Sequence, residues 1–413
     1  MTCTTIIRNY MTLIVLNTLS TSIIWGVNTL FLLDAGLNNY EAFVVNAFFT
    51  LGMVLFEIPT GVVADTVGRR ASYLLGCITL FVSSILYFYL WQIKAHMFFW
   101  IVTSLLVGLG FTFFSGALEA WLVDALKFVN YDGPLEDVFS KGQITHGLAM
   151  LLGTVIGGFA AELGDLGTPY LIRIGALFFS IVVAGLVMRD LGFEKRPLKN
   201  VSGEMKRIFK ASVDNGIKVP HIRWMMLTSP FMMGASFYVF YAAQPFLLEL
   251  YGDNEAYGVA GIAAALFAAS QIAGGMILPH VRHFFVKRTQ MIFILFAITI
   301  AALIFTSFST SFWMAICGLI VWSFAYSVAT PVKQAYMNES IASEQRATIL
   351  SFDSLMSSTG GFIFQPALGK SADIWSYPVS YMISSALQLG ALPFVYLAGR
   401  ENHPADRLDS EQK

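Results

Sequence analysis

The sequence is divided into apolar runs of about 20 residues, each bounded by charged or turn-forming residues. A helix needs a run of this length to cross the hydrocarbon core of a bilayer. Within that core the backbone satisfies its hydrogen bonds only as a helix or a closed barrel. Only 12% of the 413 residues are charged and 56% are hydrophobic, which is far from the make-up of a soluble domain. We therefore predict an all-α membrane protein and exclude a cytosolic enzyme.

Twelve runs are predicted to span the membrane, six on each side of one long polar stretch. The expected spans cover about residues 10–33, 42–64, 71–91, 97–123, 144–161, 170–188, 224–248, 257–278, 291–308, 312–332, 347–368 and 379–398. The two sets have similar lengths, as expected for six-helix bundles related by duplication. The predicted domains are an N-terminal bundle (1–188), a basic linker (189–223), a C-terminal bundle (224–398) and a polar tail (399–413).

The distribution of basic residues predicts the orientation. With the N-terminus inside, 22 of the 25 Lys and Arg residues fall on the inner side, and only Lys94, Arg173 and Lys370 fall outside. This bias is typical of cytoplasmic loops, so both termini are expected in the cytoplasm. The first apolar run is too long for a cleavable signal. We expect a multi-pass protein of the cell inner (plasma) membrane.

Charge and cysteine content indicate no further chemistry. The net charge of −1 gives no bias toward nucleic acid, and the three cysteines are scattered. His280 and His283 have no companion ligands, and the sequence contains no phosphate-binding loop. We predict no cofactor, no metal and no nucleic-acid partner, and expect a monomer whose partners are a small-molecule substrate, protons and the lipid bilayer.

A decapeptide follows the second predicted span: Gly61-Val-Val-Ala-Asp65-Thr-Val-Gly68-Arg69-Arg70. Gly61 is expected to let a neighbouring backbone approach closely, and Gly68 to take the positive φ that a short reversal needs. Asp65 and Arg69 would place fixed charges at the membrane face. A plainer interpretation is that these charges only set the topology.

This decapeptide resembles the signature of the major facilitator superfamily, G-x-x-x-D-[R/K]-x-G-R-[R/K], with Thr66 in place of the usual base. Together with the spans, the resemblance covers the chain and is closest to the twelve-helix drug/proton antiporter type. It implies two six-helix bundles with alternating access. It also implies a conformational latch in which the signature aspartate faces the start of the eleventh helix and Arg69 pairs with Asp124. The latch residues are Gly61, Asp65, Gly68, Arg69, Arg70 and Asp124.

The fifth span resembles the core of an element that is enriched in the antiporters of this superfamily. Its residues are Gly153, Thr154, Gly157 and Gly158, with Thr154 where proline is usual. Small residues at helix contacts are common in membrane bundles, so packing alone also accounts for them.

Three acidic residues, Glu57, Glu119 and Asp353, lie inside predicted spans, about 8 to 12 Å from the inner face. An intramembrane charge costs about 2.5 to 3.5 kcal/mol, so we expect these acids to function in proton coupling or substrate binding. No Lys or Arg is expected at their depth, and burial without a cation favours a protonated carboxyl group. His146 is a further candidate for proton relay. The alternative is that Glu57 and Glu119 bond to neighbouring helices near an inner gate.

Aromatic and amide side chains in the first and seventh spans are candidates for a cavity lining. They are Asn17, Thr21, Trp25, Asn28, Phe237, Tyr238, Tyr241 and Gln244. Packing within the bundle is the competing interpretation.

These features predict a secondary active transporter that exports drug-like amphipathic or cationic compounds in exchange for protons. The main alternative is a proton symporter or facilitator for a sugar or another small metabolite. A membrane enzyme that uses Glu119 and His146 is a more distant alternative. An anion carrier is disfavoured because no cation is expected deep in a span.

Overall fold

The computed structural model describes residues 1–114, 116–193, 203, 213–341 and 343–408. Regular structure in these residues is helical, apart from an isolated β-bridge between Lys287 and Arg407. Ten helices in this part of the chain are long and apolar enough to cross a membrane, and a bent pair raises the number to eleven. The predicted all-α membrane fold is confirmed. The count of twelve spans and the orientation of the termini stay predictions.

The chain forms two compact units. Unit 1 comprises Met1–Leu37, Phe48–Val201 and Glu255–Ala265, and unit 2 comprises Asn38–Ala47, Ser202–Asn254 and Leu266–Lys413. The first turns of α3 (Asn39–Thr66) thus belong to unit 2, and the first turns of α12 (Tyr257–Val281) to unit 1. Most of the predicted linker lies outside the described residues, as does the end of the tail.

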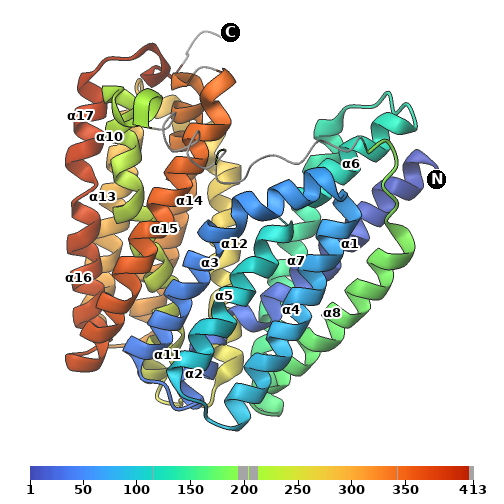
Figure 1. Cartoon of the computed structure of the whole chain (residues 1–413). Coiled ribbons are helices and arrows are strands. Elements are labelled where there is room, and N and C mark those ends of the chain that lie inside the picture. Colours follow the sequence, from blue (N-terminus) through green and yellow to red (C-terminus); the bar gives the residue numbers. More distant parts are fainter. Residues whose placement is uncertain (115, 194–202, 204–212, 342, 409–413) are drawn as a thin grey trace. The chain divides into compact units, whose positions relative to one another are not determined.

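In unit 1, α1 packs along α7 and α8, and α4 packs along α5 and α8 (Figure 1). The helices are α1 (Cys3–Trp25), α2 (Asn28–Asp34), most of α3, α4 (Arg69–Gln92), α5 (Met97–Phe114), α6 (Ala117–Phe128), α7 (Leu135–Leu163) and α8 (Thr168–Val187). The predicted first span is broken, because α1 and α2 meet at an angle of 48°. Gly26 at this break leaves room for the start of α12: a Cβ there would lie 3.2 Å from the Gly261 Cα.

One long helix of unit 2 changes type along its length. Here α10 (Pro220–Ser229) passes through the π-helical turn η2 (Pro230–Gly234) into α11 (Ala235–Tyr251). The other helices are the rest of α12, α13 (Arg288–Ser307), α14 (Phe312–Ser340), α15 (Ser343–Ile374), α16 (Tyr377–Leu389) and α17 (Leu392–Arg400), with the short turns η1 (Val213–Ile217), η3 (Arg282–Phe284) and η4 (Pro404–Asp406).

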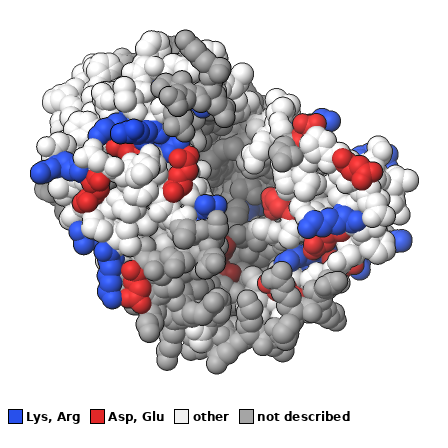
Figure 2. All heavy atoms as spheres, turned by 90° about the horizontal axis from the view of Figure 1, so that it is seen from above, with Lys and Arg blue, Asp and Glu red and all other residues white. Residues whose placement is uncertain are grey.

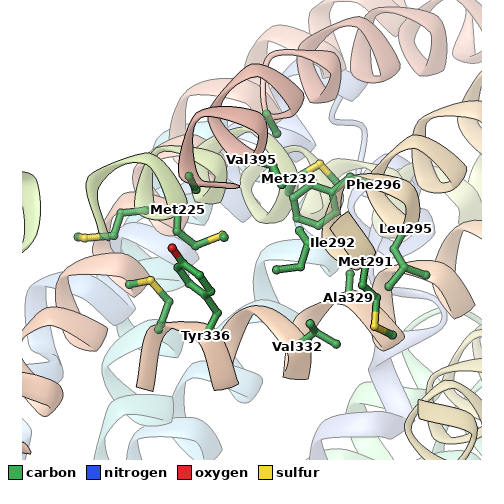
Figure 3. Packing of buried hydrophobic residues seen from close by; sticks show 14 of the residues in the cluster. Met225, Met232, Met291, Ile292, Leu295, Phe296, Ala329, Val332, Tyr336 and Val395 are labelled. Carbon is green, nitrogen blue, oxygen red and sulfur yellow. The ribbon is translucent and has the colours of Figure 1, made fainter. Parts of the chain in front are cut away.

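The core of unit 2 is an apolar cluster between α10, α13 and α14. It includes Met225, Ile292, Val332 and Tyr336, all of which point toward one another in Figure 3. Tyr336 and Met225 are fully buried. This cluster fixes the rotation of α14 about its own axis, and therefore the direction of the side chains next to Val332.

Carboxylates from other helices cap two helix starts. Asp373 of α15 accepts from the backbone N–H groups of Asn39 (3.0 Å) and Tyr40 (2.8 Å) at the start of α3. Glu162 of α7 accepts from the N–H of Gly258 (2.7 Å) at the start of α12. The first turn of a helix leaves N–H groups without partners inside the helix, and an anion there is stabilised by the helix dipole.

The end of α14 differs from the prediction. The tenth span was expected to stop at Val332, because the charge of Lys333 indicated a loop, but the helix continues to Ser340. A charge can remain within a helix when it has a partner, and Lys333 has one in unit 2.

Candidate functional site

The signature segment forms a charged cluster at one end of unit 1. Arg69, at the start of α4, donates to the carboxylate of Asp65 at 2.8 Å. Its Nε lies 3.7 Å from the carboxylate of Asp124 on α6. The structure thus brings together the three charges that the resemblance links, and their function as a latch stays a prediction. All three side chains are partly exposed, so each contact is worth at most about 1 kcal/mol.

The two glycines of this segment behave differently. Gly68 has a φ of 139°, as expected for the residue between α3 and α4. A Cβ at Gly68 would also lie 2.4 Å from the Asp190 carboxylate, which accepts from the backbone N–H of Arg70 at 2.9 Å. Gly61 is exposed, and a Cβ there would meet nothing within 4 Å in this structure, so the expected close approach of a neighbouring backbone stays a prediction.

Charged side chains of both signs mix at the helix ends of the molecule. Figure 2 shows Lys and Arg next to Asp and Glu on the face seen from above. In unit 2, Arg288 forms a bidentate pair with Glu339, with N···O distances of 2.5 and 2.7 Å. Such pairs neutralise charge locally, so the surface around the described pairs shows no patch of purely positive or purely negative charge.

Within the helices of unit 1, a polar cluster joins α1, α6 and α7. Thr18 Oγ1 and His146 Nδ1 are 2.9 Å apart. Glu119, in the first turn of α6, lies close enough for its charge to act on both His146 and Tyr10. Glu119 and His146 are both exposed. The structure therefore brings these two predicted candidates together, and among the described residues no Lys or Arg forms a salt bridge with Glu119.

Glu57 lies on α3, in the part of that helix that belongs to unit 1. Its side chain is exposed, while Thr60, one turn later, is buried and donates to the carbonyl of Thr112 on α5 at 3.2 Å. Residues three positions apart project to neighbouring sides of a helix, so Glu57 borders the contact with α5 while its own side chain stays exposed. A carboxylate facing lipid would be costly, so this exposure favours a water-filled side of the bundle.

Asp353 has a different environment, and the prediction that it lacks a cation was wrong. Lys333 Nζ of α14 lies 3.0 and 3.2 Å from the two carboxylate oxygens of Asp353 on α15. Ser229, at the end of α10, donates to the same carboxylate at 2.5 Å and accepts from Lys333. Sequence analysis missed Lys333 and Ser229, although apolar residues on both sides of Lys333 could have indicated a continuing helix.

A second cation also lies within a helix. Arg173 of α8 is only 2% exposed, and its Nε donates to the Ser84 hydroxyl of α4 at 2.9 Å. The sequence analysis placed Arg173 in an outer loop. The argument against anion carriers, which assumed that no cation lies inside a span, therefore does not hold.

The candidate cavity residues in α1 and α2 are partly buried and belong to unit 1. They are Asn17, Thr21, Trp25 and Asn28. Thr21 donates to the carbonyl of Asn17 at 2.9 Å, which ties up its hydroxyl within α1. Asn28 accepts from the Tyr170 hydroxyl at 2.9 Å. These side chains are available only in part for a ligand.

The candidates in α11 belong to unit 2 and fall into two groups. Phe237 and Tyr241 are partly buried. Tyr238 is fully buried, hydrogen-bonded to Ser380 and packed against Phe43 with ring centroids 4.6 Å apart. Gln244 is also buried. In this structure Tyr238 and Gln244 are buried among their neighbours in unit 2, and their role as cavity residues stays a prediction.

The antiporter-like element of α7 is a packing surface in unit 1. Gly153, Thr154, Gly157 and Gly158 are all buried. A Cβ at Gly157 would lie 1.7 Å from the Ile23 carbonyl oxygen of α1, and one at Gly158 would lie 2.8 Å from the Gly261 Cα of α12. These glycines allow three helices to approach closely, which the packing interpretation predicts. A further role in antiport stays a prediction.

Among the described residues, no group of three or more His, Cys, Asp or Glu side chains is placed to hold a metal ion. The candidate side chains of these helices that can carry a charge are the carboxylates, His146 and Lys333. These groups can bind and release protons or hold a charged substrate, as a helical transporter requires.

Comparison with protein families supports this class. Residues 10–365 match the model of the Major Facilitator Superfamily, and the chain belongs to this family. It is thus a multi-pass membrane transporter and not an enzyme. Comparison with curated proteins gives no match.

Solved transporters share the fold at low sequence identity. The nucleoside transporter NupG is 12% identical, with a TM-score of 0.70 over 95% of this chain and 98% of that one. A D-xylose-proton symporter is 16% identical, with a TM-score of 0.69 over 95% and 96%. A bacterial homolog of the human lysosomal transporter Spinster is 16% identical, with a TM-score of 0.70 over 99% of both chains. At these identities the likeness concerns the fold.

Proposed function

We propose that this chain is a proton-coupled secondary transporter that exports amphipathic or cationic compounds by alternating access. The observation that carries the proposal is the Glu119 cluster of unit 1. Glu119 is an exposed carboxylate that forms no salt bridge with a described Lys or Arg, its charge acts on His146, and His146 also contacts Thr18.

The chemistry of this cluster suits exchange of a proton for a cation. A carboxylate held at membrane depth without a cationic partner gains from taking up a proton or from binding a positively charged substrate. Because both ligands neutralise the same charge, they compete for it. A site at which proton and substrate compete is what an antiporter needs, since release of one then drives binding of the other.

The charged cluster of Asp65, Arg69 and Asp124 would act on the conformational equilibrium rather than on the substrate. It ties the start of α4 to the end of α6 at one end of unit 1. A contact that forms in one conformation and breaks in the other changes the populations of the two states. We propose that these residues, with Gly61, Gly68 and Arg70, form the latch.

The proposed setting follows the sequence analysis. The protein would lie in the cell inner membrane with both termini in the cytoplasm, and a six-helix bundle would lie on each side of the linker. Proton-driven export is consistent with such an orientation, since protons would enter the cell as substrate leaves.

The test is transport into everted membrane vesicles. We expect vesicles that contain the protein to accumulate a lipophilic cation such as tetraphenylphosphonium when a proton gradient is imposed, and to lose it when the gradient is dissipated. Glu119→Gln should abolish this accumulation, and Glu41→Gln, at the exposed start of α3, serves as the control. Gradient-independent movement of this cation, or its uptake in right-side-out vesicles only, would refute the proposed export.

A further inference from the structure

The ion pair of unit 2 is a three-residue site from three helices. Lys333 contributes an ammonium group from α14, Asp353 a carboxylate from α15 and Ser229 a hydroxyl from the end of α10. The ammonium contacts both carboxylate oxygens, at 3.0 and 3.2 Å. The side chains of Lys333 and Asp353 are 15% and 19% exposed, so each retains a small open surface.

The surroundings of this site are apolar. Val332 and Tyr336, on either side of Lys333 along α14, belong to the core cluster of unit 2 (Figure 3), and Phe231 and Phe352 pack against that cluster. Few polar groups in an apolar setting are typical of a small-molecule site.

The backbone next to Ser229 is also unusual. The π-helical turn η2 starts at Pro230, immediately after Ser229, and a Cβ at Gly360 of α15 would lie 2.4 Å from the Pro230 carbonyl oxygen. Single π-helical turns occur frequently at functional sites. Ser229 thus lies directly before a π-helical turn, at a close contact between that turn and α15.

A buried ion pair is weak evidence for stability. Apolar residues of similar size often stabilise a fold as well or better, because they avoid the cost of removing two charges from water. Ionisable groups within membrane helices usually serve ligand or proton binding. The pair therefore calls for a functional explanation, which the Glu119 cluster of the other unit does not supply.

We propose that Lys333 and Asp353 form a proton-dependent site for the carboxylate group of a small apolar molecule. The pair is neutral as it stands. When a carboxylate binds to the Lys333 ammonium, Asp353 loses its counter-ion and takes up a proton from solvent, so that the site stays neutral. One proton is thus taken up for each carboxylate bound, and both are released together.

The shape of the site favours an incoming anion. The four-carbon stem of Lys333 lets the ammonium turn to a new partner while keeping its charge. Asp353 is short, and once protonated it still has the Ser229 hydroxyl as a hydrogen-bond partner. When the ion pair separates, the Lys333 ammonium therefore bonds to the incoming carboxylate, and the protonated Asp353 keeps its hydrogen bond to Ser229.

The groups that face Asp353 come from α14 and from α10, which contributes Ser229. Lys333 and Tyr326 lie on α14, and the charge of Asp353 acts on Tyr326. On α15 itself, the nearest described cation in sequence is Arg346, which donates to the Ile341 carbonyl. An incoming carboxylate would thus bind to the ammonium of Lys333.

The test is isothermal titration calorimetry on the purified full-length chain in detergent, with benzoate as the probe and benzamide as its uncharged match. At a pH of about 6.5 benzoate is ionised, since carboxyl groups ordinarily titrate near 4. Titrations in two buffers with different ionisation enthalpies give the number of protons taken up. We expect benzoate to bind with uptake of about one proton, and benzamide to bind roughly a hundredfold more weakly.

Variants separate the site from the fold. The double variant K333Q/D353N leaves no uncompensated charge and should fold like the wild type, yet lose both benzoate binding and proton uptake. Lys333→Arg should retain binding, and Lys370→Gln, on the exposed end of α15, should be unaffected. No heat of benzoate binding by the wild type, binding without proton uptake, or unchanged binding by the double variant would each overturn the proposal.

This inference rests on the proposed function only for its role in transport. The binding experiment needs neither a proton gradient nor Glu119. Failure of export in vesicles with intact benzoate binding would therefore refute the proposed function alone. Loss of benzoate binding with intact export would refute only this site.

Discussion

The two units hold the candidate acids Glu119 and Asp353 in opposite ways. In unit 1, Glu119 is exposed on α6 and interacts with His146 and Tyr10, with no salt bridge to Lys or Arg among the described residues. In unit 2, Asp353 is partly buried and bonded to Lys333 and Ser229. The first acid has a charge to neutralise, whereas the second is already neutralised.

This difference suggests that the two acids respond to different ligands. An acid without a cation responds directly to a proton or a positive ligand. A paired acid changes state only when its partner is taken away, because protonation alone would leave an ammonium unpaired. Two acids in one chain can thus respond to opposite kinds of ligand.

The largest effect is expected for the acid of unit 1. Glu119→Gln should abolish proton-driven accumulation, because a neutral amide neither takes up nor releases a proton. One charge moving through 100 mV supplies about 2.3 kcal/mol, and uphill transport should be lost with it. Substrate-evoked proton release from proteoliposomes measures this. Exchange at the wild-type ratio in Glu119→Gln would show that the residue is structural, and Glu57→Gln and Asp353→Asn would then locate the coupling.

The second prediction concerns the contribution of the unit 2 ion pair to the stability of the protein. Lys333→Met should destabilise the protein by about 3–5 kcal/mol, because it leaves the Asp353 carboxylate partly buried and uncompensated. The double variant K333M/D353L should recover most of this loss. Thermal unfolding in detergent gives the comparison, with Glu119→Gln as a variant expected to unfold like the wild type. Equal losses in the single and double variants would contradict the pairing.

A third prediction concerns the contact between α1 and α7 in unit 1. Gly157→Ala should cost about 1–3 kcal/mol, because its Cβ would collide with the Ile23 carbonyl and force α1 away from α7. Gly175→Ala on α8, where nothing lies within 4 Å, should be neutral or slightly stabilising. Unfolding of both variants tests this. If Gly157→Ala leaves stability unchanged and alters transport, the element has a role beyond packing.

The fourth prediction tests the charges at the end of unit 1. Asp65→Asn and Arg69→Ala should slow transport severalfold and leave substrate affinity nearly unchanged, because a ligand-independent bias changes populations more than local contacts. Transport rates and equilibrium binding, measured on the same preparations, separate the two effects. Wild-type rates in both variants would rule out a latch.

The smallest effect is the coupling between Arg69 and Asp124. At 3.7 Å and partly exposed, this pair should contribute about 1 kcal/mol or less, far below the pair in unit 2. Arg69→Gln and Asp124→Asn should nevertheless be non-additive, since each removes the same contact. A double-mutant cycle on transport rates measures the coupling, and strictly additive losses would show that the two residues act separately.

Hydropathy and charge patterns predicted the fold class well, because the bilayer dictates helix length and composition. The turn at Gly68 was equally predictable, since its neighbours leave room only for a short reversal. The partner of Asp353 was not, because whether two residues that are 20 positions apart meet depends on the rotation of α14 and α15. That rotation is set by core residues such as Tyr336, which a linear pattern does not reveal.

Asp190 shows a second limit of prediction. It is the second residue after the predicted sixth span, and nothing in its spacing indicates a bond to the start of α4, 120 positions earlier. The burial of Tyr238 could not be predicted either, because a row of aromatic residues gives the same sequence pattern whether it faces a cavity or packs against a neighbouring helix.

The π-helical turn at Pro230–Gly234 also has a consequence for helix register. A π-helical turn contains about one residue more than an α-helical turn, and each residue turns an α-helix by about 100°. Deleting one residue here would therefore restore an unbroken α-helix, while rotating everything after it relative to Ser229. Phe237 and Tyr241 would then move to another side of the helix. The extra residue thus determines which aromatic side chains lie on the same side of the helix as the Ser229 hydroxyl. A related chain with one residue inserted or deleted at this turn would place different aromatic side chains on that side, although its sequence would be nearly the same.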